Sequence, residues 1–245
     1  MRIDEVKIKS RGNRLVIFGD SFARIYKHRL QENRWQASLA TRLGVAKIVS
    51  YAEEGTSLFY SLQALNNYII NDYKKDDVIV FIVTSWTRFP VLHQGVNVNI
   101  QSQANTLAYD FGDAEIPMPT YFKENLETLM FLVNNMVTKE NHGMYMRCVD
   151  AILKSLENKY IILDAFDNSK YYNLHPYDKN NFNLFDVSEN EFRLDQSVTD
   201  VYLRQDDRVN HLSPVNHLIL GKLLYTYFSE DSYTFSVDRF KKGIV

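Results

Sequence analysis

Near the start of the chain, a serine follows a short apolar run in a way that suits nucleophilic chemistry. Gly19, Asp20 and Ser21 come directly after residues 15–18, whose composition predicts a buried strand. A serine at such a strand end stands clear of the backbone, and the amides of the turn can stabilise a developing oxyanion. The structural alternative is that Asp20 or Ser21 simply caps a following helix, since both residue types favour that position.

A serine nucleophile needs a base, and the last part of the chain offers one. A hydroxyl is a poor nucleophile near neutral pH until a histidine, itself oriented by a carboxylate, accepts its proton. His211 follows Asp206 and Asp207 and precedes a helical segment, so an acid and a base lie on one loop. His217 lies inside that helical segment and is interpreted as structural. The other histidines have no comparable context and receive no role: His28, His93, His142 and His175.

Alternating strands and helices must position these residues. Four apolar runs predict strands buried on both faces, at residues 15–18, 47–52, 78–83 and 160–165. Helical patterns are expected over residues 122–137, 145–156 and 213–227, the last beginning with Ser213 and Pro214 as N-cap and first-turn proline. This alternation predicts a largely parallel sheet covered by helices on both sides. Because parallel strands end at the same edge of a sheet, Ser21 and His211 are expected to meet there.

Two segments depart from the plain alternation. Residues 90–120 are expected to form loops with an edge hairpin, and residues 167–204 a long loop rich in Tyr and Phe. Loops of this length are usually functional or disordered, and the aromatic content of the second segment argues against disorder. No internal repeat or flexible linker divides the sequence, so one domain over residues 1–245 is expected.

Composition limits the classes of function. The 245 residues include 28 basic and 30 acidic side chains, so no surplus of positive charge would attract nucleic acid or an anionic membrane. Cys148 is the single cysteine, which excludes an intrachain disulfide. No cluster has metal-ligand spacing and no glycine-rich nucleotide loop is present, so neither metal nor cofactor is expected. The polar residues 1–14 and the lack of a long apolar stretch predict a soluble, cytoplasmic protein without a signal peptide.

Several short blocks together resemble the SGNH (GDSL-type) hydrolase superfamily. They are Gly19-Asp20-Ser21, residues 51–57 with Gly55, and His211-Leu212-Ser213, and residues 35–44 resemble the family segment between the first two blocks. Their order and approximate spacing agree with the family from residue 15 to residue 228. The resemblance implies an α/β protein with a three-layer α/β/α, flavodoxin-like fold and a mainly parallel five-stranded sheet with long loop insertions.

The same resemblance implies a role for each matching residue. Ser21 would be the nucleophile, His211 the general base and then acid, and Asp207 or else Asp206 its orienting partner. The amides of Ser21 and Gly55 would be oxyanion donors. Glycine suits that role, because a residue without Cβ lets its amide approach a substrate oxygen closely.

Two departures from the family pattern bear on activity. The family places the acid three residues before the histidine, where this chain has Arg208, so the site either reaches Asp207 through a bulge or works as a Ser-His dyad. The family's oxyanion asparagine after the third strand is also missing. The expected substitutes as donors are Thr84, Ser85, Thr87 and the indole of Trp86. Loss of one oxyanion donor costs about a hundredfold to a thousandfold in turnover, so a weak or specialised enzyme is expected.

The expected function is cleavage or transfer of an acyl ester, most plausibly an O-acetyl group on a carbohydrate, by a Ser-His-Asp triad. The alternative is a non-catalytic binding or structural module that keeps the fold, for example a component of a virus particle. Few Gly and Pro residues with abundant Asn, Tyr and Lys suit a phage-encoded chain, whose place would be the host cytoplasm or the virion. The sequence leaves the acyl group, the alcohol and the oligomeric state open.

Overall fold

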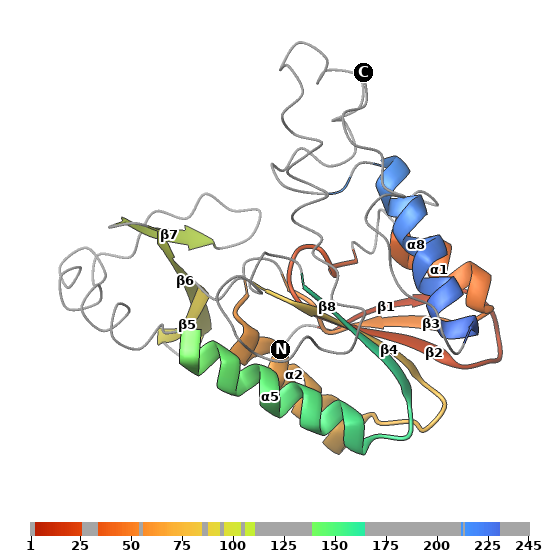
Figure 1. Cartoon of the computed structure of the whole chain (residues 1–245), viewed down its shortest axis with the longest axis horizontal. Coiled ribbons are helices and arrows are strands. Elements are labelled where there is room, and N and C mark those ends of the chain that lie inside the picture. The colour runs from red at the N-terminus through yellow and green to blue at the C-terminus, as the bar shows by residue number, and fades with distance from the viewer. Residues whose placement is uncertain are drawn as a thin grey trace, which may run out of the picture.

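Among the residues that the computed structural model describes, five strands form a central sheet in the order β1-β3-β2-β4-β8 (Figure 1). These residues are 3–25, 34–53, 56–84, 88–93, 96–103, 106–110, 139–164, 212 and 214–230. The strands are β1 (Asp4–Lys7), β2 (Arg14–Phe18), β3 (Lys47–Ser50), β4 (Val78–Val83) and β8 (Lys159–Asp164). Strands β2, β3, β4 and β8 run parallel, while β1 pairs antiparallel with β3 at the edge.

The strand order makes β2 the place where the chain changes direction across the sheet. From β2 the chain passes to β3 on one side, and later to β4 on the other side. In the register of β2 and β4, Phe18 lies opposite Phe81, so both strands end at the same edge. Open α/β sheets bind ligands at the carboxyl ends of their strands, beside such a switch point. The chain leaves β2 at this place with Gly19, Asp20 and Ser21.

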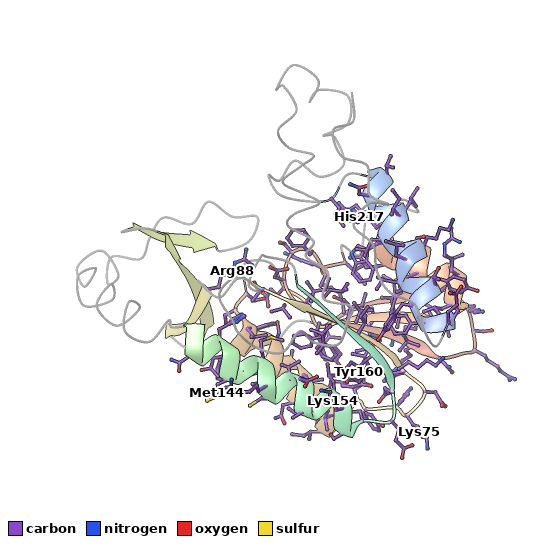
Figure 2. All side chains as sticks on the ribbon, viewed as in Figure 1. Lys75, Arg88, Met144, Lys154, Tyr160 and His217 are labelled. Atoms are coloured by element: carbon purple, nitrogen blue, oxygen red, sulfur yellow. The ribbon has the colours of Figure 1, made fainter. Side chains whose placement is uncertain are left out.

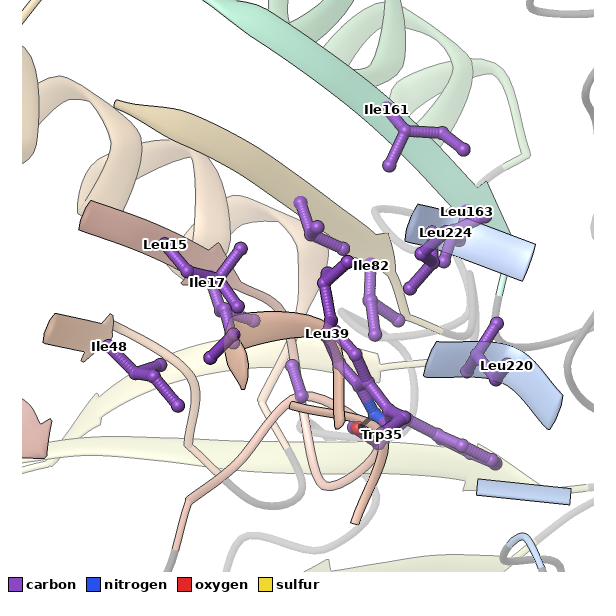
Figure 3. Close-up of a cluster of buried hydrophobic side chains, with 14 of the residues drawn as sticks. Leu15, Ile17, Trp35, Leu39, Ile48, Ile82, Ile161, Leu163, Leu220 and Leu224 are labelled. Atoms are coloured by element: carbon purple, nitrogen blue, oxygen red, sulfur yellow. Dashed lines mark hydrogen bonds between the residues drawn. The ribbon is translucent and has the colours of Figure 1, made fainter. Parts of the chain in front are cut away.

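Helices α1 (Trp35–Leu43) and α8 (Pro214–Ser229) cover one face of the sheet. Strand residues alternate between the faces, so Leu15 and Ile17 point toward this layer. They belong to a buried cluster that also contains Trp35 and Leu220, shown in Figure 3. α1 and α8 approach closely at Gly221, where an added Cβ would stand 2.7 Å from the Cβ of Ser38.

The opposite face is covered by α2 (Leu58–Asn71) and α5 (Lys139–Ser155). Here Val16 and Phe18 face outward from β2 into a second buried cluster. The ring of Phe18 stacks on Tyr51 at 5.2 Å and meets Tyr68 edge-on at 5.6 Å. The sheet is therefore enclosed between two helical layers, and the predicted three-layer α/β/α, flavodoxin-like class is confirmed. Within the described ranges, every helix is too short or too polar to span a bilayer.

A second, antiparallel sheet lies outside this sandwich (Figure 1). It consists of β5 (Arg88–His93), β6 (Val96–Gln103) and β7 (Thr106–Asp110), in the order β5-β6-β7. The sequence predicted loops and an edge hairpin over residues 90–120. The structure differs, because three strands form a sheet of their own. The signal was present in residues 96–101, where apolar and polar side chains alternate with the period of a strand.

Two other parts of the sequence prediction differ or go beyond the described residues. Strand β1 was missed because its polar sequence, Asp-Glu-Val-Lys, lacks the apolar run of a central strand. Such a composition is tolerated on an edge strand. The predicted helix over residues 122–137 and the aromatic segment 167–204 lie outside the described residues. A single domain over residues 1–245 stays a prediction.

Candidate active site

The turn after β2 depends on a glycine. Gly19 has φ +138°, a backbone conformation that residues other than glycine rarely adopt. An added Cβ there would stand 2.8 Å from both the Cβ and the carbonyl oxygen of Ile82. The absence of a side chain therefore lets the backbone of this turn lie directly against β4.

Asp20 organises the turn that follows. Its carbonyl oxygen accepts hydrogen bonds from the amides of Ala23 and Arg24, both at 3.0 Å. Its carboxylate oxygen Oδ1 accepts the amide of Phe22 at 3.1 Å, as an N-cap residue does. The side chain of Asp20 therefore caps this turn. Ser21 lies on the same turn and is partly exposed, although Asp20 beside it is fully buried.

The helix expected directly after Ser21 is not present in the described residues. Residues 21–23 form a turn, and the next described helix, α1, begins at Trp35. The positive end of a full helix is therefore not observed at Ser21. The backbone amides of the turn are therefore the local groups that could stabilise an oxyanion at Ser21, and the carboxylate of Asp20 holds the turn in place.

The second oxygen of Asp20 ties this turn to the neighbouring strand. Oδ2 accepts the hydroxyl of Thr84 at 2.9 Å and Nη1 of Arg88 at 2.7 Å. The same Nη1 donates to Oγ1 of Thr84 at 2.9 Å. The side chains of Arg88 and Asp20 are 10% and 0% exposed, so this ion pair is shielded from solvent. Figure 2 shows Arg88 at the edge where β4 ends, and Lys75, just before β4, at the opposite edge.

Thr84 was one of the residues expected to donate to an oxyanion. Its hydroxyl donates instead to Asp20 and accepts from Arg88. A hydroxyl has a single proton, so donation to a substrate would require the bond to Asp20 to break. Ser85, Trp86 and Thr87, the other candidates named with it, lie outside the described residues.

His142, on α5, binds the backbone of Thr84 at the end of β4. Its Nε2 donates to the carbonyl oxygen of Thr84 at 3.2 Å, and the ring is buried. Burial lowers the pKa of His142 to about 4, although the bond to Thr84 favours the protonated form. The imidazole is therefore neutral at pH 7, and its role here is to hold the end of β4.

The sequence analysis gave His142 no role, but a signal was available. His142, Met146, Val149 and Leu153 recur at spacings of four, three and four, which places them on one face of α5. All four are buried in the structure. A histidine on the apolar stripe of a helix is expected to be buried and to need a hydrogen-bond partner.

The second loop of the expected site lies beside the first. The amide of Glu53 donates to the carbonyl oxygen of Gly19 at 3.2 Å. Thr56 donates its hydroxyl to the carbonyl oxygen of Glu53 at 2.7 Å, and Tyr60 donates to Oε2 of Glu53 at 2.6 Å. Glu54 and Gly55 lie outside the described residues. Thr56, which follows them, also donates its hydroxyl to the carbonyl oxygen of Gly19 at 3.4 Å, so both Glu53 and Thr56 bind the turn that carries Ser21.

The structure thus brings together the expected loops of three strands, with Ser21 and Thr84 among the described residues. His211, Asp207 and Asp206 lie outside the described residues. Leu212, the residue after His211, is buried in the same cluster as Phe22 and Ala23, which follow Ser21.

The interpretation of His217 as structural agrees with its surroundings. His217 lies in the first turns of α8, and its ring is buried. Its Nε2 accepts a hydrogen bond from Nη1 of Arg34 at 3.2 Å. No group of three or more His, Cys, Asp and Glu side chains within the described ranges could hold a metal ion.

Comparisons with known proteins give a distant likeness only. No protein-family model matches the chain, and no curated protein matches it. Among solved structures, it is similar to one titled "putative lipolytic protein of G-D-S-L family", from Desulfitobacterium hafniense DCB-2. The two chains share 13% identity and a TM-score of 0.43, over 86% of this chain and 97% of that chain. At that TM-score the likeness carries no weight, so the fold assignment rests on the strand order and the helical layers described above.

Proposed function

We propose that the protein is a serine hydrolase of the SGNH type, which cleaves or transfers an acyl ester with Ser21 as nucleophile. One observation carries the proposal. From Arg14 to Ala23 every residue is buried except Ser21, which is partly exposed at the carboxyl edge of the sheet. The turn that holds Ser21 there requires glycine at position 19 and buries the carboxylate of Asp20, which depends on its partners Thr84 and Arg88.

The proposed reaction has two steps. His211 accepts the proton of Ser21 as Oγ attacks the ester carbonyl carbon, and then returns that proton to the leaving alcohol. Water, activated by His211, cleaves the acyl-serine and releases the acid, or a second alcohol takes the acyl group. Asp207, with Asp206 as the alternative, orients the imidazole, and the amides of Ser21 and Gly55 stabilise the oxyanion.

The position of Leu212 supports the participation of His211. Leu212 is buried in the cluster that includes Phe22 and Ala23, on the face covered by α1 and α8. The chain thus returns to the neighbourhood of the Ser21 turn at the residue that directly follows the proposed base.

For the substrate we propose an O-acetyl ester of a carbohydrate, with no nucleic acid, membrane or cofactor involved. The aromatic segment 167–204 is proposed to cover a sugar ring or an acyl chain. Replacement of both Tyr171 and Tyr172 by alanine is expected to raise KM for an acetylated glycan without lowering the melting temperature. A fall in melting temperature at constant KM would show that these two residues serve packing instead.

The experiment that tests the function compares hydrolysis of p-nitrophenyl acetate by the wild type and by Ser21→Ala. Removal of a catalytic nucleophile typically costs more than about a thousandfold in kcat, and that loss is expected here. Ser155→Ala is the matched control, because Ser155 is exposed at the end of α5, near the start of β8. Equal rates for all three proteins would contradict the hydrolase function.

The second candidate is a binding or structural module without catalysis. It is favoured by the hydroxyl of Thr84, which donates to Asp20 where related enzymes are expected to present a donor to the substrate. On this alternative, Ser21→Ala would leave the background rate unchanged and would also leave binding to a partner, such as another virus-particle component, intact.

A further inference from the structure

Arg88 is the cation that pairs with Asp20, the residue directly before the proposed nucleophile, and the function proposed above gives it no role. It begins β5, and its side chain is 10% exposed beside the fully buried side chain of Asp20. Burial of an arginine and a carboxylate gains little stability over a well-packed apolar pair, so such a pair is weak evidence for a purely stabilising role.

The carboxylate of Asp20 acts as a clamp with two sides. Oδ1 holds the amide of Phe22, directly after Ser21, at 3.1 Å. Oδ2 holds Nη1 of Arg88 at 2.7 Å and the hydroxyl of Thr84 at 2.9 Å. One carboxylate oxygen thus binds the turn that carries Ser21, and the other binds residues at the end of β4 and the start of β5.

The far side of this clamp is itself fixed. His142 on α5 donates to the carbonyl oxygen of Thr84 at 3.2 Å, which ties the end of β4 to the helical layer. Arg88 adds a second bond to Thr84 through the same Nη1. The position of the Ser21 turn is therefore determined by a continuous chain of contacts from α5 to β2.

We propose that Arg88 is the positioning residue for Ser21, acting through the carboxylate of Asp20. This inference rests on the hydrolase function proposed above. A displacement of about 1 Å in a reacting group can cost about a hundredfold in rate, so loss of the clamp lowers turnover even when the protein stays folded. Arg88 is not a catalytic residue on this account, because it acts on the turn and not on the ester.

The central test is kcat and KM of Arg88→Met with p-nitrophenyl acetate, beside the wild type and Ser21→Ala. Methionine keeps an unbranched chain but removes the charge and the donors. We expect kcat to fall about a hundredfold while KM stays within about twofold. Millimolar guanidinium ion is expected to restore part of the lost kcat in Arg88→Ala, whose truncated side chain leaves room for it.

A double variant separates positioning from stability. Arg88→Met leaves the buried Asp20 carboxylate without its cation, which destabilises the fold, whereas Arg88→Met with Asp20→Asn removes both charges. The double variant is expected to recover thermal stability but not kcat, and its loss of kcat should not exceed that of Arg88→Met alone, because both changes break one clamp. It also keeps the test decisive if Arg88→Met fails to fold. Lys154→Met, which removes a surface cation, is the matched control.

The outcomes distinguish the inference from the function on which it rests. If Ser21→Ala is inactive and Arg88→Met or the double variant keeps wild-type kcat, the role of Arg88 is overturned while the hydrolase function stands. A raised KM at constant kcat would assign Arg88 to substrate binding and would equally overturn positioning. Full activity of Ser21→Ala would overturn both proposals together.

Discussion

The two ends of strands β2 and β4 carry the same kind of ion pair, an arginine with a buried aspartate, but surround it differently. At the amino edge, Arg14 donates from Nη2 to Oδ2 of Asp77 at 2.6 Å and from Nη1 to Oδ1 of Asp72 at 2.8 Å. At the carboxyl edge, Arg88 donates from Nη1 to Oδ2 of Asp20 at 2.7 Å. The amino-edge pair is surrounded by further partners, while the carboxyl-edge pair holds the turn of a partly exposed serine.

At the amino edge, the carboxylates that bind Arg14 also accept hydrogen bonds from tyrosines. Tyr68 donates to Asp77 at 2.8 Å and Tyr51 donates to Asp72 at 3.0 Å. Burial and these bonds to carboxylates raise the pKa of both tyrosines well above its usual value. Burial opposes the charge of Arg14, but its hydrogen bonds to Asp77 and Asp72 outweigh burial and raise its pKa. Burial also opposes the charge of Asp72, but the hydrogen bonds from Arg14 and Tyr51 lower its pKa.

The difference shows that a buried arginine–aspartate pair has a different role at each edge of the sheet. At the amino edge, where Asp72 and Asp77 each bind both Arg14 and a tyrosine, the ion pair joins β2, α2 and the start of β4 and contributes to stability. Where the carboxylate also binds the backbone of a turn, the pair fixes the position of a side chain that reaches solvent. Substitutions at the two edges should therefore separate stability from turnover.

The largest effect on stability is expected from Arg14→Met at the amino edge. Removal of one partner from a buried ion pair leaves uncompensated carboxylates and lowers the free energy of unfolding by about 3–5 kcal/mol. Urea denaturation measures this loss, and kcat per folded molecule is expected to stay unchanged. A loss below about 1 kcal/mol would show that solvent reaches the network.

Gly19→Ala is expected to damage both stability and turnover. The positive φ and the 2.8 Å approach to Ile82 combine backbone strain with overpacking, which together cost about 2–4 kcal/mol. Gly221→Ala is the matched control, because its Cβ would stand 2.7 Å from Ser38 between α1 and α8, away from the turn. Equal kcat per folded molecule in the two variants would contradict a special role for the Ser21 turn.

His142 predicts a loss of stability at higher pH than the amino edge, where the lowered pKa of Asp72 acts only below its usual value of 3.8. Its pKa is about 4 in the folded protein against 6.5 for an unperturbed histidine, so the unfolded state binds its proton first as pH falls. Stability from this group is complete above pH 6.5 and declines between pH 6.5 and about 4, by roughly 3 kcal/mol.

The measurement is urea denaturation at several pH values for the wild type and His142→Gln. Glutamine keeps a donor toward Thr84 and does not titrate, so the variant should show a smaller decline over this interval. Parallel pH curves for the two proteins would mean that His142 is protonated, or reached by water, in the folded state.

The smallest effect is expected for an exposed ion pair. Lys154 donates to Asp150 at 2.7 Å one turn earlier on α5, and its side chain is 61% exposed. Such helical surface pairs are worth about 0.3–0.5 kcal/mol, so Lys154→Ala should change stability by less than about 0.5 kcal/mol and leave kcat unchanged. A loss above about 1 kcal/mol would contradict the contrast between buried and exposed pairs.

Much of the fold could be predicted because buried parallel strands have a strong local signal. The apolar runs at residues 15–18 and 78–83 correspond to β2 and β4, and the alternation with helices gave the layers. Strand β1 could not be found in this way, because its pairing with β3 is decided by tertiary contact and not by its own polar sequence. Strand β6 of the second sheet could have been found from the alternation over residues 96–101.

The motif of the candidate site could be predicted from the sequence, but the residues that hold it in place could not. Gly19, Asp20 and Ser21 identify themselves by their place after a buried strand. The roles of Arg88 and His142 depend on contacts across 68 and 58 positions of the chain, which no local pattern encodes. The bond from the Thr84 hydroxyl to Asp20 is also a long-range contact. No local pattern shows it, so the sequence left Thr84 as a candidate donor to the substrate.

The central claim is that Ser21 is a reactive nucleophile, and covalent labelling tests it most directly. The wild-type protein is incubated with an organophosphonate and digested, and the modified peptide is sequenced by mass spectrometry. The account predicts one phosphonyl group on Ser21 and a loss of esterase activity in proportion to labelling. A protein that stays unmodified, or that is modified at another residue while Ser21 remains intact, would contradict it.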